Sequence, residues 1–227
     1  MRLRLLGALF PLLLCSPVLA AETTLTIAGA TVKVPVVSLR EARFRSVVRQ
    51  EHDFSCGSAA IATLLTHHYG RPTTEAQAFE AMFATGDQQV IQRQGFSMFD
   101  MQRYLASLEL KSDGYRVGLD KLAEVGVPAI TLINTKGYNH FVVIKGIRDG
   151  EVLVGDPAAG LKVVSRAEFE SLWQGVIFVI HDDIDTGRDG FNRPQDWAIR
   201  RKAPFGTAMS RNGLATISVM LPGLREF

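Results

Sequence analysis

The residue that stands out for chemistry is Cys56, in the segment Ser55-Cys56-Gly57-Ser58. Apolar residues recur at helical spacing from Cys56 to His68, and Tyr69-Gly70-Arg71-Pro72 predicts the end of that helix. Cys56 would then lie in the first helical turn, where unpaired amide N–H groups and aligned peptide dipoles favour the nucleophilic thiolate. Asp53 and Ser55 are the candidate caps, and Gly57 would leave room for a substrate backbone close to the sulfur.

A thiol nucleophile needs a base that takes its proton and returns it to the leaving group, and histidine has a suitable pKa. The five candidates are His52, His67, His68, His140 and His181. His67 and His68 would lie roughly 16 to 18 Å from Cys56 along one helix, and His52 and His181 stand in polar surroundings typical of a surface. His140 opens the apolar run Phe141-Val142-Val143-Ile144, so a strand would aim it from the rim of a sheet into a cleft. The pattern predicts His140 as the base.

A third group commonly orients such an imidazole, and Asp156 is the candidate. A two-residue turn at Asp149-Gly150 would pair Arg148 with Glu151 and would send Asp156 and His140 to opposite faces of the sheet. A three-residue loop with Gly150 in the left-handed conformation would pair Ile147 with Glu151 and place Asp156 opposite Val142, on the face of His140. We predict the three-residue loop. Without that pairing, Asp156 would only cap its Asp-Pro turn.

Gln50, six residues before Cys56, is available as a side-chain donor to an oxyanion, although its spacing alone favours a surface glutamine. His52, Asp53 and Cys56 could be imagined as zinc ligands, but no second ligand pair follows at a known spacing. We therefore expect no metal and no organic cofactor.

The chain organisation that must position these residues begins with an export signal. Residues 1–20 combine Arg2 and Arg4, an apolar run and a small-residue site, which predicts a secretory signal cleaved after Ala20 or Ala21. A retained amino-terminal anchor is the alternative, and membrane contact is expected only through this segment. Cleavage would remove Cys15 and bring the formal net charge from +2 to zero, because two arginines and no acids are lost. No nucleic-acid partner is implied, and Cys56 would stand alone in a compartment where cysteines normally pair.

The rest of the chain predicts an α+β fold in which N-terminal helices pack on a mostly antiparallel sheet. Residues 21–45 form an N-terminal extension, with a short hairpin or extended arm at Thr24–Leu39; residues 46–181 form the main domain, and residues 182–227 form an appendage outside the core fold. Further helices are expected at Thr74–Phe83, Ser97–Leu108 and Lys121–Val125, strands at 129–133, 140–147, 151–156, 161–165 and 176–180, and a hairpin at Asn212-Gly213.

The segment from Gln50 to Ala60 resembles the active-site segment of the bacteriocin-processing, double-glycine leader cysteine peptidases, a papain-like family. His140-Phe141-Val142-Val143, the turn Asp156-Pro157 with Gly160, and Phe169 with Trp173-Gln174-Gly175 resemble later motifs of that family in the same order. The resemblance covers roughly residues 46 to 181. It implies Cys56 as nucleophile, His140 as base and then acid, Asp156 as orienting group and Gln50 as oxyanion donor. It also implies cleavage after a Gly-Gly pair in a narrow cleft.

The best-known members of that family are cytosolic domains fused to an ABC exporter, whereas this sequence begins with a predicted secretion signal. Signal included, it resembles the stand-alone peptidases of functional amyloid (Fap) secretion systems, which implies a periplasmic location and amyloid subunits or outer-membrane export machinery as partners. The rival interpretations are a non-catalytic periplasmic peptide-binding or assembly factor, and an acyl transferase or amidase that uses the same two residues.

Overall fold

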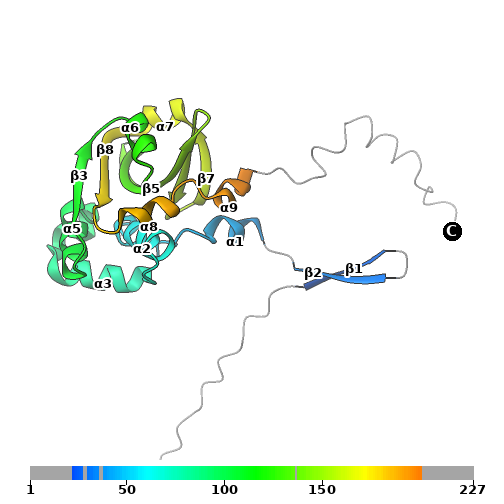
Figure 1. Cartoon of the computed structure of the whole chain (residues 1–227). Coiled ribbons are helices and arrows are strands. Elements are labelled where there is room, and N and C mark those ends of the chain that lie inside the picture. Colours follow the sequence, from blue (N-terminus) through cyan, green and yellow to red (C-terminus); the bar gives the residue numbers. More distant parts are fainter. Residues whose placement is uncertain (1–21, 28–29, 36–37, 136, 201–227) are drawn as a thin grey trace, which may run out of the picture. The chain divides into compact units, whose positions relative to one another are not determined.

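The computed structural model describes residues 22–27, 30–35, 38–135 and 137–200 (Figure 1). The predicted signal segment 1–20 and the predicted hairpin at Asn212-Gly213 lie outside the described residues. Two units are separate in the chain, one ending at Leu39 and one beginning at Arg40. In the first unit, β1 (Glu22–Ile27) and β2 (Ala30–Pro35) pair antiparallel, which selects the hairpin from the two expected forms of this arm.

The second unit is an α+β domain, as predicted, whose sheet is antiparallel throughout and has the strand order β3-β8-β4-β5-β6-β7. Its strands are β3 (Ser112–Arg116), β4 (Ala129–Thr135), β5 (Tyr138–Arg148), β6 (Glu151–Asp156), β7 (Gly160–Ser165) and β8 (Trp173–Ile180). Its helices are α1 (Leu39–Phe44), α2 (Cys56–His68), α3 (Glu75–Thr85), α4 (Gln88–Gln94), α5 (Met98–Ser107), α6 (Leu119–Val125), α7 (Arg166–Leu172), α8 (Ile184–Asp189) and α9 (Pro194–Trp197), with a final 3-10 turn at Ala198–Arg200. No helix among the described residues combines the length and the apolar content needed to cross a bilayer.

The helices predicted from local signals begin where their caps indicate. Thr74 and Gln77 form a capping box at the start of α3, and Ser97 and Asp100 form another at the start of α5. The sequence analysis did not predict β3, α1, α4, α7, α8 or α9. These are short or polar segments whose conformation depends on packing against the rest of the domain.

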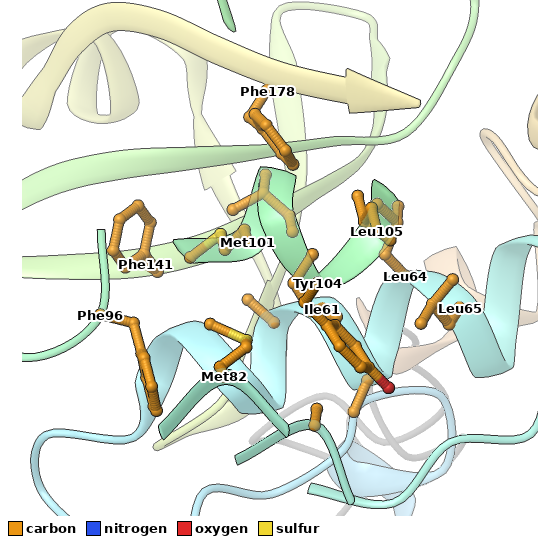
Figure 2. Packing of buried hydrophobic residues seen from close by; sticks show 14 of the residues in the cluster. Ile61, Leu64, Leu65, Met82, Phe96, Met101, Tyr104, Leu105, Phe141 and Phe178 are labelled. Carbon is orange, nitrogen blue, oxygen red and sulfur yellow. The ribbon is translucent and has the colours of Figure 1, made fainter. Parts of the chain in front are cut away.

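The two larger apolar cores of the described residues lie on the two sides of the sheet. The first joins α2, α3 and α5 to β4, β5 and β8, and Figure 2 shows Ile61, Leu64 and Leu65 of α2 among the side chains that fill it. The second gathers residues of α6 and α7 with the opposite side chains of β4, β5, β6 and β8. Burial on both sides of the sheet holds α2, and with it Cys56, in a fixed position relative to β5.

The hairpin between β5 and β6 does not have the predicted loop. Arg148 pairs with Glu151 across a two-residue turn in which Asp149 and Gly150 both have positive φ, at 52° and 73°. That pattern is the type I′ turn that Asp-Gly favours, so the predicted three-residue loop is wrong. A β-bulge between Ile144 and Gly146 shifts the register by one residue, and beyond it Val143 pairs with Gly155. The next step places Asp156 at the level of Val142, on the face of His140, so the bulge supplies the alignment assigned to the loop.

The bulge residue, Lys145, enters a buried polar cluster. Its ammonium donates to the Ser46 carbonyl at 2.8 Å, lies 3.0 Å from Nε2 of His68 and forms an ion pair with Asp196 at 3.3 Å. Burial lowers the pKa of Lys145 to about 8, although Asp196 opposes this change. The cluster joins α2, β5, α9 and the segment before Gln50.

The described part of the C-terminal segment belongs to this domain, in contrast to the predicted appendage. Phe191 and Trp197 are buried. The backbone N–H of Asn192 donates to the Lys145 carbonyl at the bulge. Asp196 supplies the carboxylate that compensates buried Lys145. Residues 182–200 therefore complete the core next to β5.

Candidate active site

Cys56 is the first residue of α2 and is only 5% exposed. Ser55 occupies the N-cap position, as expected, but its hydroxyl makes no cap hydrogen bond to the helix. Instead it donates to the His52 carbonyl at 3.0 Å and accepts from the His52 amide at 3.1 Å, which closes the loop before the helix. Asp53, the other candidate cap, is exposed in that loop. The first amides of α2 are thus left without a side-chain cap next to the thiol.

His140 and Asp156 form the pair that the sequence predicts. The imidazole Nε2 lies 2.8 Å from Oδ1 of Asp156, and both side chains are buried. Because Nε2 faces the carboxylate, Nδ1 is the ring nitrogen left for the thiol, and Cys56 lies close enough to His140 to raise its pKa. A thiol, an imidazole and a carboxylate therefore stand in one row.

The electrostatics of this row favour a charged imidazole. Burial alone would lower the pKa of His140, but the hydrogen bond with Asp156 and the nearby Cys56 outweigh it and raise the pKa to about 9. Burial would raise the pKa of Asp156, yet the hydrogen bonds from His140 and Lys162 hold it well below its usual value. At neutral pH the carboxylate is ionised and the imidazole holds its proton.

Lys162 is a member of this site that the sequence analysis missed. Its ammonium lies 2.8 Å from Oδ2 of Asp156, while the amides of Ala158 and Ala159 donate to Oδ1 at 2.9 and 3.2 Å. The signal was available in the β6–β7 pairing, in which Val154 pairs with Lys162, so that Lys162 and Asp156 share a face. The carboxylate is therefore held from both sides, by a cation and by its own turn.

Gln50 is half-buried, on the segment that leads to α2. Its backbone N–H donates to the Pro157 carbonyl at 3.1 Å, which ties this segment to the turn after Asp156. The side-chain Nε2 donates to the His52 carbonyl at 2.9 Å, and a primary amide keeps a second N–H for another acceptor. Its Oε1 is buried without a hydrogen-bond partner. The role of Gln50 as an oxyanion donor stays a prediction.

A cleft of about 700 Å³ opens over Cys56. One wall is the loop before α2 together with residues 92–98, and the other is formed by Leu132, Phe141, Gly137 and the first two residues of β5. Gly57 was expected to leave room for a substrate backbone, but the structure has no such room beside it. A side chain there would meet Cβ of Phe96 at 2.9 Å and Cε of Met101 at 3.0 Å, so the space beside Gly57 holds the protein's own core.

The other histidines lie away from the Cys56 thiol. His67 and His68 are at the far end of α2, and His181 contacts Tyr115 and Asp113 next to β3. His52 is exposed, as expected, and its ring stacks on Phe54. Among the described residues, no three His, Cys, Asp or Glu side chains are grouped to hold a metal ion.

A buried thiol at a helix start, paired with an imidazole and a carboxylate across an α+β cleft, defines the class of papain-like cysteine peptidases. A family model described as "Peptidase C39 family" matches residues 45–184. The "Probable functional amyloid protease FapD" of Pseudomonas aeruginosa is 40% identical over 175 residues, which cover 77% of each chain. The chain belongs to the Peptidase C39 family and is a cysteine peptidase.

Two solved structures share this fold. The peptidase domain of Streptococcus ComA, a bi-functional ABC transporter, superposes with a TM-score of 0.52 at 21% identity, covering 60% of this chain and 96% of that one. A double glycine motif protease from an AMS/PCAT transporter, solved in complex with its leader peptide, superposes with a TM-score of 0.50 at 24% identity, covering 59% of this chain and 89% of that one. These likenesses confirm the predicted papain-like α+β fold.

Proposed function

We propose that this chain is an exported, periplasmic cysteine peptidase that cleaves a secreted protein after a Gly-Gly pair and takes part in functional amyloid biogenesis. The observation that carries the proposal is the row of Cys56, His140 and Asp156, of which Cys56 lines the cleft. The Gly-Gly site is supported by the solved double glycine motif protease that shares this fold. The amyloid role is supported by the name of the Pseudomonas relative, and export by the signal pattern of residues 1–20.

In the proposed reaction, the Cys56 thiolate attacks the carbonyl carbon that precedes the cleaved bond. The oxyanion accepts hydrogen bonds from the first amides of α2 and from the second N–H of Gln50. The leaving amine takes the proton from Nδ1 of His140, and a thioester on Cys56 remains. His140 then removes a proton from water, the resulting hydroxide attacks the thioester, and the acid and the thiol are released.

Asp156 and its partners keep the imidazole in the orientation that these steps require. The N–H at Nε2 donates to Asp156, so Nδ1 is the nitrogen that faces sulfur and leaving group. The negative carboxylate also stabilises the imidazolium that pairs with the thiolate. No step draws on a metal or an organic cofactor.

The test is to co-express the full chain, or its Cys56→Ala variant, with candidate secreted proteins from the same cell and compare fragments by intact-mass spectrometry. We expect a cut after Gly-Gly with the wild-type chain and none with Cys56→Ala. Identical fragments, with full secretion in both strains, would favour a peptide-binding assembly factor instead. Cell fractionation tests location, since the proposal requires a periplasmic chain that begins at Ala21 or Glu22.

A further inference from the structure

Tyr138, the first residue of β5, crosses the cleft. Its hydroxyl donates to the Asp53 carbonyl at 2.7 Å, and Asp53 lies in the loop just before Cys56. Its ring stacks over that of His140, with centroids 6.3 Å apart and planes 29° apart. Tyr138 is 53% exposed, whereas Cys56 and His140 below it are 5% and 8% exposed. The Tyr138 ring therefore lies between solvent and the reacting pair.

The hairpin that carries Tyr138 is fixed by side chains. Asn134 donates from Nδ2 to Oδ1 of Asn139 at 2.9 Å and accepts the Gly137 amide at 2.9 Å. Gln174 of β8 donates to the same oxygen of Asn139 at 3.2 Å. Because these hydrogen bonds already fix the hairpin, keeping Tyr138 in place costs little conformational entropy.

The opposite wall is equally constrained. The His52 ring stacks on Phe54 with centroids 5.6 Å apart, and Ser55 closes the loop between His52 and the helix. Gly95, at φ +79°, brings the next loop so close that a side chain there would meet the Phe54 carbonyl at 3.2 Å. Neither wall can yield easily to a larger substrate side chain.

Burial raises the pKa of Tyr138, and the nearby Cys56 and Asp53 raise it further. The hydroxyl therefore stays protonated at neutral pH, and it remains a donor to the Asp53 carbonyl. The bridge across the cleft persists at neutral pH.

We propose that Tyr138 is a specificity-determining residue whose bridge to the Asp53 carbonyl limits the space over Cys56 to a backbone without side chains. The two residues before the cleaved bond must pass beneath this ring to bring their carbonyl to the sulfur, so glycine is accepted and alanine is resisted. This inference rests on the proposed cleavage after Gly-Gly and names the residue that enforces it.

The test compares three peptides that differ only in the two residues before the cleaved bond. These residues are Gly-Gly, Gly-Ala or Ala-Gly. Wild type, Tyr138→Ala and Tyr138→Phe are assayed for kcat/KM on each peptide. Tyr115→Ala is the matched control, because Tyr115 is an exposed tyrosine on β3 that contacts His181 outside the cleft.

We expect Tyr138→Ala to lower the preference for Gly-Gly over at least one alanine peptide by tenfold or more, and to raise kcat/KM for that peptide above the wild-type value. Tyr138→Phe keeps the ring but loses one hydrogen bond, so its preference should fall by about two- to tenfold. The Tyr115→Ala control should keep the wild-type preference. A purely structural role of Tyr138 would lower all three rates together.

Preferences within twofold of wild type in a folded Tyr138→Ala variant would overturn the inference. If circular dichroism finds that variant unfolded, Tyr138→Phe decides, and an unchanged preference there overturns the inference. Failure of the wild-type chain to cleave any Gly-Gly peptide would instead count against the proposed function.

Discussion

Replacing Lys162 with methionine tests how the charges around Asp156 set the pKa of His140. The Lys162 ammonium and the imidazole contact the two oxygens of one carboxylate, each at 2.8 Å. Removing the cation takes away a repulsion that opposes the imidazolium and leaves Asp156 uncompensated. The variant should therefore hold the imidazole proton to higher pH.

The magnitude follows from the separation of the two positive charges. Unit charges roughly 6 Å apart interact by about 0.7 kcal/mol in water and by about 3 kcal/mol at an effective dielectric constant of 20. The Lys162 side chain is 39% exposed, so the lower part of this range applies, about 1 kcal/mol. That value corresponds to a rise of about 0.5 to 1 in the pKa of His140.

The assay is kcat/KM for a Gly-Gly peptide as a function of pH. The alkaline limb, set by loss of the His140 proton at a pKa of about 9, should move to higher pH in Lys162→Met and stay in place in Lys162→Arg. Lys121→Met removes a surface lysine paired with Glu124 on α6 and should leave the limb unchanged. Added salt should reduce the difference, because the pair is partly exposed. An alkaline limb that stays in place or moves to lower pH in Lys162→Met would refute the reasoning.

Three other substitutions have expected outcomes. Asp156→Asn removes the negative charge that raises the pKa of His140, so the alkaline limb should move to lower pH; a limb that remains near pH 9 contradicts this. Gln50→Ala should lower kcat by about a hundredfold with little change in KM, and steady-state kinetics that change only KM would count against an oxyanion donor. Lys145→Met leaves buried Asp196 without its cation and should cost about 3 to 5 kcal/mol in urea unfolding. Adding Asp196→Asn should recover most of that loss, and no recovery would mean that the two residues are not coupled.

The parts of the fold that the sequence predicted well are those with local signals. The capping residues Thr74 and Ser97 sit next to the helices they start, and the apolar runs of β4, β5, β6 and β8 are typical of buried strands. β3 was missed because Ser-Asp-Gly-Tyr-Arg is polar, and its extended form depends on pairing with β8. Local rules apply where the cause of a structure lies within a few residues.

The alignment of His140 with Asp156 could be predicted, but its cause could not. The sequence analysis required a three-residue loop to bring both side chains to one face, whereas the Asp149-Gly150 turn obeys its own local preference. The bulge that restores the alignment occurs at Lys145, whose partners Ser46 and Asp196 are distant in sequence. Pairing arithmetic cannot detect a bulge that long-range partners stabilise.

Two residues beside the reacting row also escaped prediction, for different reasons. Lys162 could have been found, because the short β6–β7 hairpin places it on the face of Asp156. Tyr138 could not, since its partner is a backbone carbonyl at Asp53, on a separate element 85 positions away in the sequence. Motifs identify the reacting groups more readily than the residues that shape the space around them.

The most direct test of the central claim is to trap the acyl-enzyme. Wild-type chain mixed with a Gly-Gly leader peptide and quenched rapidly in acid should gain the mass of the N-terminal fragment less one water, on the proteolytic peptide that contains Cys56. The adduct should be removed by hydroxylamine, as a thioester is, and should be absent from Cys56→Ala. Peptide cleavage that proceeds at the wild-type rate in Cys56→Ala, or an adduct on another residue, would contradict the assignment of Cys56 as the nucleophile.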